Sequence, residues 1–133
     1  MEVQKAPDIQ QKIEDIISTL NSIEEQKHLN QYRIICMRSF NSKARAYARI
    51  WAFPKIWQKA LDIGTFYVIE ILAEHFDRLD ESEKEKVLIH ELLHIPKTFS
   101  GALIDHNNPH RPIRKQTVNA LWEKYKQLKL KEF

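Results

Sequence analysis

The segment between Asp80 and Pro96 constrains the fold of this chain more than any other part of the sequence. Asp80 can cap a helix, and Glu83, three positions on, can complete a capping box with it. Pro96 ends the helix because the residue before a proline avoids helical geometry. The apolar residues that share one face of this helix are Val87, Leu88, Leu92 and Ile95. The pattern predicts a capped helix with one face packed on a core.

Within this helix, residues His90 to His94 read H-E-L-L-H and match the pattern H-E-x-x-H. Residues i and i+4 lie on one helix face, so both imidazoles can bind one metal ion. Glu91 lies beside the first histidine, where it can reach a metal-bound water rather than the metal. A bound cation would also compensate the burial of these polar groups in an apolar run. The motif therefore predicts one Zn²⁺ per chain; the alternative is two ordinary histidines on a surface helix.

A catalytic zinc needs a third protein ligand and an open position for water. The spacing favours His106 over His110, and both lie in a loop that must turn back towards the helix. Asp105 is a further oxygen candidate in the same loop. Upstream, His75 and His28 remain open but are less convenient, and surface or capping roles suit them better.

The expected chemistry is hydrolysis by a zinc-bound water that Glu91 deprotonates, with the proton passed later to the leaving group. A further donor should stabilise the oxyanion, and His110, Arg111 and Tyr67 are unranked candidates for that or for substrate contact. Residues 65–72 form a strand just before the active helix. If this strand has a free edge, an extended peptide could pair with it and bring its carbonyl to the metal.

The rest of the sequence predicts a mixture of helices and strands. In chain order we expect a helix over 8–27, a β-hairpin over 32–53, a helical turn over 56–61, a strand over 65–72, a loop over 97–111 and a helix over 112–130. Alanines leave a helix open as an alternative for 44–53. With only 2 glycines, an all-β fold with many turns is disfavoured. We predict one α+β domain over 1–133, with a short, mainly antiparallel sheet of about three strands between N-terminal and C-terminal helices.

Composition narrows the cellular setting. Hydrophobic residues make up 43% of the 133 residues, as expected for a globular domain. Cys36 is the single cysteine and cannot form an internal disulfide, so we expect it to be a buried strand residue. No apolar run is long enough to span a bilayer, and the polar N-terminus has no signal-peptide core. These features predict a cytoplasmic protein without a membrane partner.

The net charge of +3 leaves a nucleic-acid partner possible but not favoured. Trp51, Phe53 and Trp57 interleave with Arg49 and Lys55, which could form a stacking platform for bases. Aromatic residues more often serve packing, and basic residues more often form an ordinary solvated surface. Oligomeric state is not readable from the sequence.

The run from Val87 to Gly101, with His106 after it, resembles a family of small archaeal and phage-associated predicted metallopeptidases. Arg49-Ile50-Trp51 and the run 76–79 are similar to that family too, and the resemblance covers about residues 32–118. It implies a minimal zincin-like fold, in which a twisted sheet packs on the metal-binding helix. It further implies peptidase activity on a peptide or protein substrate. The roles that it implies are zinc ligands for His90, His94 and His106, and catalytic base for Glu91.

The leading prediction is therefore a zinc-dependent metallopeptidase. One alternative is a zinc hydrolase that acts on another amide substrate. A third is a basic, non-enzymatic module that binds nucleic acid or protein around a structural zinc. Such a zinc would be closed by four ligands, for which His90, His94, His106 and His110 are available. That alternative leaves Glu91 without a role.

Overall fold

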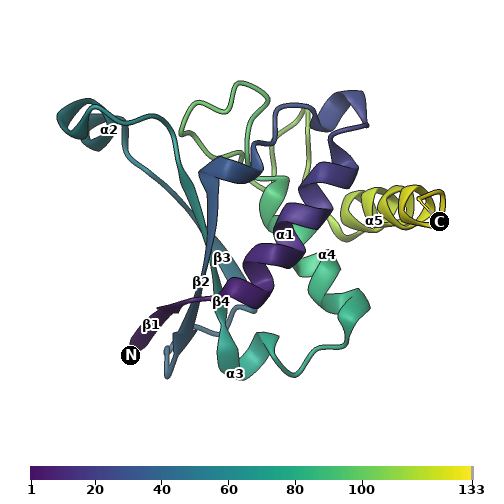
Figure 1. The fold of residues 1–133 in the computed structure, drawn as a ribbon, viewed down its shortest axis with the longest axis horizontal. Helices are drawn as coiled ribbons and strands as arrows, with labels where there is room; N and C mark the ends of the chain where they lie inside the picture. The colour runs from purple at the N-terminus through teal and green to yellow at the C-terminus, as the bar shows by residue number, and fades with distance from the viewer. Residues whose placement is uncertain (133) are drawn as a thin grey trace.

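The computed structural model describes residues 1–132, and a four-stranded mixed sheet lies at its centre (Figure 1). Its strands are β1 (Glu2–Lys5), β2 (Ile34–Phe40), β3 (Ala48–Ala52) and β4 (Tyr67–Leu72). They follow the order β1-β2-β4-β3 across the sheet. β2 and β4 run parallel, while β1 with β2 and β3 with β4 run antiparallel. β4 is therefore a central strand and β3 is an edge strand.

This topology confirms an α+β fold but corrects the predicted sheet. The hairpin predicted over 32–53 is wrong, because β4 lies between β2 and β3. Alternation along a strand shows which face it buries but not which strand it pairs with. The prediction of about three strands missed β1, whose four residues are all exposed and carry no hydrophobic pattern. The sheet is mixed: two of its three pairings are antiparallel, in line with the predicted mainly antiparallel sheet, and its central pairing is parallel.

The helices are α1 (Pro7–Leu20), α2 (Lys55–Leu61), α3 (Ala73–Phe76), α4 (Glu81–Leu92) and α5 (Lys115–Leu130), with 3₁₀ turns at Glu24–Gln26 and Gln31–Arg33. α1 is shorter than the predicted 8–27. After its last residue the Nδ2 of Asn21 donates to the carbonyls of Gln26 and Leu29, and these bonds hold a turn. α5 begins later than the predicted 112. Pro112 lies before the helix, and its carbonyl accepts from the hydroxyl of Thr117.

The core lies between the sheet and α1, α4 and α5, which are all on one side of it in Figure 1. Ile13, Ile16 and Ile17 of α1 are fully buried, as are Ile69 of β4 and Leu88 of α4. Cys36 is also buried in β2, as predicted. Helical spacing therefore places the apolar face of α1 on the sheet and leaves its polar face outside.

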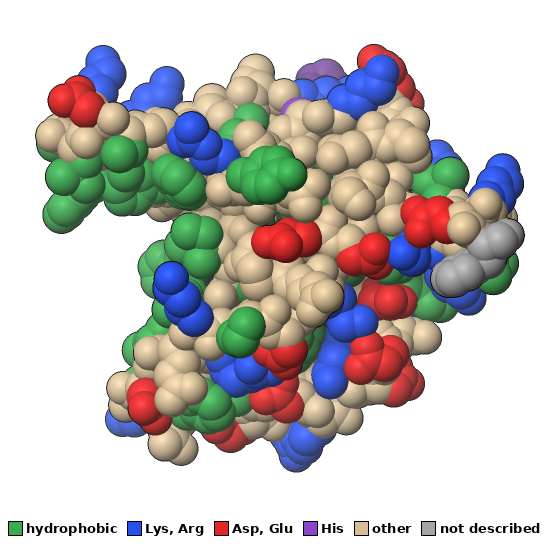
Figure 2. Space-filling model, viewed as in Figure 1, with side chains coloured by type: hydrophobic (Ala, Val, Ile, Leu, Met, Phe, Trp, Pro, Cys, Tyr) green, Lys and Arg blue, Asp and Glu red, His purple; other side chains and the backbone are tan. Residues whose placement is uncertain are grey.

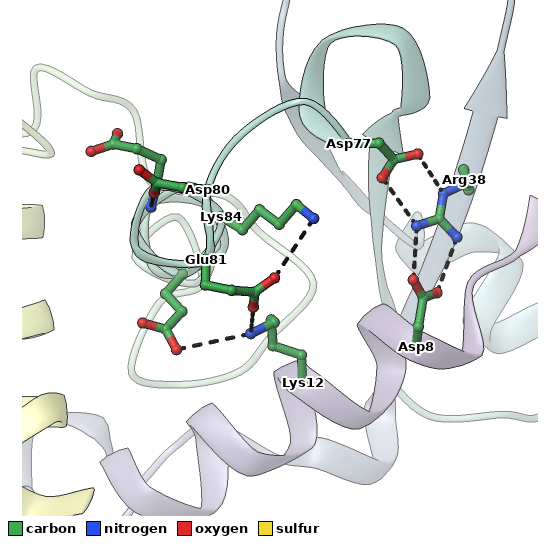
Figure 3. A network of polar contacts seen from close by, with 9 residues as sticks. Asp8, Lys12, Arg38, Asp77, Asp80, Glu81 and Lys84 are labelled. Atoms are coloured by element: carbon green, nitrogen blue, oxygen red, sulfur yellow. Dashed lines mark hydrogen bonds and ion pairs between the residues drawn. The ribbon is translucent and has the colours of Figure 1, made fainter.

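Ion pairs join these layers at the surface (Figure 3). The guanidinium of Arg38, on β2, donates to both carboxylate oxygens of Asp8 at 3.0 and 2.9 Å. It also donates to Asp77, just after α3, at 3.1 Å. Lys12 of α1 pairs with Glu81 at the start of α4. These contacts join α1 to the sheet and to α4, the helix that carries His90.

α2 projects away from the rest of the molecule at the end of β3 (Figure 1). Figure 2 shows hydrophobic side chains gathered on this projection. Among the exposed large apolar residues of this region are Ile56, Trp57, Leu61 and Ile63. None of the helices in the described part of the chain is long and apolar enough to cross a membrane.

Candidate metal centre

Three histidines converge at the end of α4. His90 lies in the helix, His94 lies in the turn just after its last residue, and His106 comes from the loop beyond. One ring nitrogen from each of the three lies within 4.8 Å of the others. The Nε2 atoms of His90 and His106 are 3.0 Å apart. Two nitrogens bound to one tetrahedral zinc are about 3.3 Å apart, so the group is of the right size to hold a metal ion.

The loop reaches the helix through a reciprocal pair of hydrogen bonds with His94. The amide of Ile104 donates to the carbonyl of His94 at 2.7 Å. The carbonyl of Ile104 lies 2.6 Å from Nδ1 of His94. That contact assigns the proton of the neutral ring to Nδ1 and leaves Nε2 with a free lone pair for a metal. At the other end, the amide of Ile113 donates to the carbonyl of His106 at 3.0 Å.

Tyr67, on β4, holds the start of the same loop. Its side chain is fully buried, and its hydroxyl accepts from the amide of Gly101 at 2.9 Å. The hydroxyl also donates to the carbonyl of Ala102 at 2.9 Å. Gly101 has a φ of 93°, a conformation that favours glycine. The hydroxyl of Tyr67, a predicted candidate for the oxyanion donor, thus bonds to the loop backbone, and Tyr67 does not line the cavities found beside the histidines.

Glu91 lies beside the histidines without being one of the three converging groups. Its side chain is buried, and Oε2 is 4.0 Å from Nε2 of His90. Burial raises the pKa of Glu91 to about 8. A cation at the histidines would favour the carboxylate form and lower that pKa. Glu91 is therefore placed to exchange a proton near neutral pH.

His90 and His94 are held in the form that binds metals. Burial, with smaller contributions from the charges of His94 and His106, lowers the pKa of His90 to about 4. Burial also lowers the pKa of His94. Both rings are therefore neutral at neutral pH, and no proton has to be displaced from them before a cation binds.

Two cavities meet at the cluster and form one groove. The larger, about 610 Å³, has an apolar wall of Tyr47, Val87 and Val118. The smaller, about 310 Å³, is lined by β3, by Leu103 and by the three histidines. Ala48, His90 and Glu91 line both cavities. The groove follows the edge strand β3 and passes over the cluster.

The predicted docking edge over 65–72 is wrong. This segment forms β4, which pairs with β2 on one side and β3 on the other. Five of its six residues are buried, and both of its sides pair with neighbouring strands, so no backbone groups are left for a further strand. The exposed edge nearest to the histidines belongs to β3 instead.

The remaining candidates lie outside the cluster. Among residues 1–132 the grouping of three or more possible ligands contains neither His110 nor Asp105. His110 and Arg111 line a separate cavity, described below. His28 lies with Nε2 at 3.2 Å from the carbonyl of Ile95, and His75 lies in α3. The structure thus brings His106, and not His110, to His90 and His94.

Trp51 and Arg49, considered above as part of a stacking platform, face Glu70 of β4. The indole of Trp51 donates to Oε1 of Glu70 at 2.8 Å, and Arg49 donates to the same oxygen at 2.7 Å. The guanidinium also lies over the indole ring, 5.2 Å from its centroid. These side chains serve the packing of the sheet, although Trp51 and Trp57 remain about half exposed.

Sequence reasoning missed the residues that build the groove and support the loop. Tyr47, Val87 and Val118 come from three separate segments, and only the folded chain joins them. Ile104 acts through its backbone carbonyl, which residue type does not signal. No local pattern could have identified either group.

Comparison with known proteins shows a family match: a family model described as "Putative phage metallopeptidase" matches residues 1–131. No curated protein and no solved structure matches the chain.

Proposed function

The chain belongs to the putative phage metallopeptidase family, and from that membership and its three-histidine cluster we propose that it is a zinc-dependent peptidase. The observation that carries the proposal is the convergence of His90, His94 and His106 beside a buried, non-ligating Glu91. Three imidazoles suit Zn²⁺, and a three-histidine set leaves a position open for water. We also propose that the sheet and α4 form a zincin-like arrangement, as the family resemblance implies.

His90, His94 and His106 would hold the zinc through ring nitrogens. Bound there, zinc would polarise the scissile carbonyl and lower the pKa of an attacking water. Glu91 takes a proton from that water on its carboxylate and delivers it to the leaving amine nitrogen. Its burial suits both steps, because a carboxyl group whose pKa lies near neutral can accept and release a proton.

The groove along β3 supplies the substrate contacts. An extended peptide can add to the exposed edge of β3, with main-chain hydrogen bonds giving affinity. This pairing would carry the peptide backbone over Ala48 and Ile50 and past the histidines. The apolar wall of the larger cavity would accept a side chain next to the scissile bond. A substrate with another kind of amide would use the histidines but not the strand edge.

Metal content of the purified chain tests the site. Elemental analysis should find about one zinc per chain in the wild type and in Glu91→Gln, and a clear loss in His106→Ala. His110→Ala is the matched control and should keep the zinc. Loss of zinc in His110→Ala as well would favour the closed, structural site with four histidines.

Hydrolysis of a mixed peptide library, read by mass spectrometry, tests the activity. The wild type should cleave, and Glu91→Gln should lose at least about 100-fold in rate while keeping its zinc. A zinc-loaded wild type that cleaves no peptide would contradict the peptidase proposal. Equal rates in the wild type and Glu91→Gln would contradict the role of Glu91.

A further inference from the structure

A second cavity, of about 500 Å³, opens on a different part of the molecule from the histidine groove. It is bounded by residues 23–26, by both ends of the 97–111 loop and by the first turns of α5. It shares no lining residue with the two cavities at the histidines. It is therefore a separate space that the proposed peptidase mechanism does not use.

The rim of this cavity is cationic. Lys97, His110, Arg111 and Lys124 line it, whereas Glu25 is the acidic residue among its lining residues. Within residues 1–132, no carboxylate lies within 4.0 Å of Lys97, Arg111 or Lys124 to form an ion pair. Three cationic side chains thus line one concave space without forming an ion pair, and Glu25 leaves a net positive charge there.

Arg111 is only partly exposed. Its Nη1 is buried and has no hydrogen-bond partner among the described residues. Burial also lowers the pKa of this guanidinium. Lys97 lines the same cavity. Partial burial of a guanidinium costs free energy, which an anion against its accessible nitrogens would offset.

The floor of the cavity is apolar. It is lined by three buried residues: Leu93 just after α4, Ile113 just before α5, and Leu121 in α5. An inorganic anion would use only the rim and leave this floor unused. A ligand that matches both parts has one anionic head and a hydrocarbon body.

We propose that this cavity binds an organic carboxylate, with its head against Arg111 and Lys97 and its apolar body against Leu93, Ile113 and Leu121. A guanidinium matches a carboxylate through two parallel hydrogen bonds, which fixes the orientation of the head. The C-terminal residue of a peptide with an aliphatic side chain has this chemistry. The site does not depend on zinc or on the proposed peptidase activity.

Calorimetric titration of the full chain with N-acetyl-leucine tests the proposal. The protein is stripped of metal with a chelator and then desalted, so that neither a bound metal nor the chelator competes for the carboxylate. N-acetyl-leucinamide is the uncharged match for the ligand, and inorganic phosphate is the match for its charge. We expect saturable binding of N-acetyl-leucine at one site, and binding at least about tenfold weaker for each of the other two.

Variants locate the site. Arg111→Gln and Lys97→Gln should each weaken the binding of N-acetyl-leucine about tenfold. Arg114→Gln removes an exposed charge from the same stretch of chain, outside the cavity, and should leave the binding unchanged. If Arg111→Gln does not fold, Lys124→Gln takes its place beside Lys97→Gln.

Four results would overturn the proposal. Equal binding of the amide would show that the cationic rim has no role. Equal binding of phosphate would show the same for the apolar floor. Absence of binding, or an equal loss in Arg114→Gln and Lys97→Gln, would leave only a diffuse basic surface.

Discussion

The hydroxyl of Tyr67 should control the candidate metal site, although it hydrogen-bonds to none of the three histidines. It accepts from the amide of Gly101 and donates to the carbonyl of Ala102, both at 2.9 Å. The loop held in this way supplies His106. Tyr67→Phe removes one oxygen atom and leaves both backbone groups without their partner.

The expected loss follows from these two bonds. A buried hydrogen bond contributes about 0.5–1.5 kcal/mol net, so Tyr67→Phe should lower the free energy of unfolding by about 1–3 kcal/mol. Removal of a group that orients a metal ligand from the second layer typically lowers metal affinity about 10- to 100-fold. The zinc affinity of the variant should fall within that range.

Urea denaturation of the metal-free chain, followed by tryptophan fluorescence, measures the first effect. Competition with a chromophoric chelator measures the second. Tyr32→Phe is the control for an exposed tyrosine, since Tyr32 is 82% exposed. Tyr125→Phe is the control for a tyrosine with a single bond, to Asp15 at 3.1 Å. If Tyr67→Phe matched Tyr32→Phe in both measurements, Tyr67 would not order the loop.

Two further substitutions test the packing that supports the site. Burial raises the pKa of Glu70, but hydrogen bonds from Arg49, Ser39 and Trp51 outweigh it, so the pKa lies below its usual value. Its ionised form therefore stabilises the fold above the unfolded pKa of about 4.3, and this contribution is lost as the pH falls through the lower, folded pKa. Glu70→Gln should cost about 2 kcal/mol in urea denaturation at pH 7 and less below pH 4, and a gap that stayed constant with pH would refute this. Asp80→Ala removes the cap bond to the amide of Glu83. It should cost about 1 kcal/mol, and an unchanged midpoint would show that the cap does not stabilise α4.

Local patterns predicted the parts of the fold that short stretches of chain determine. Asp80 caps α4 as predicted, because a capping side chain and its amide lie three residues apart. The spacing of two histidines on that helix depends only on helical geometry. The sequence also ranked His106 above His110, and the loop brings His106 to the helix.

The sequence did not predict which strands pair with one another, because the partners lie far apart in the chain. Residues 65–72 form a strand as predicted, but the choice of neighbours depends on how much of each strand can be buried. β4 has five of its six residues buried and lies inside the sheet, which displaces β3 to the edge. β1 adds to the far edge through backbone bonds alone, so its polar sequence gives no signal.

The strand order, with β4 inside the sheet and β3 at its edge, explains how the site can be both rigidly held and open to substrate. A central strand is hydrogen-bonded on both sides, so Tyr67 projects from a fixed backbone and can hold the loop of His106 in place. An edge strand keeps one row of backbone groups unpaired, and β3 presents that row beside the histidines. Had β4 been the edge, as the docking hypothesis required, its tyrosine would have anchored the loop from a strand that also had to bind substrate. The observed order separates these tasks, so substitutions at Tyr67 should act on metal affinity and those along β3 on substrate binding.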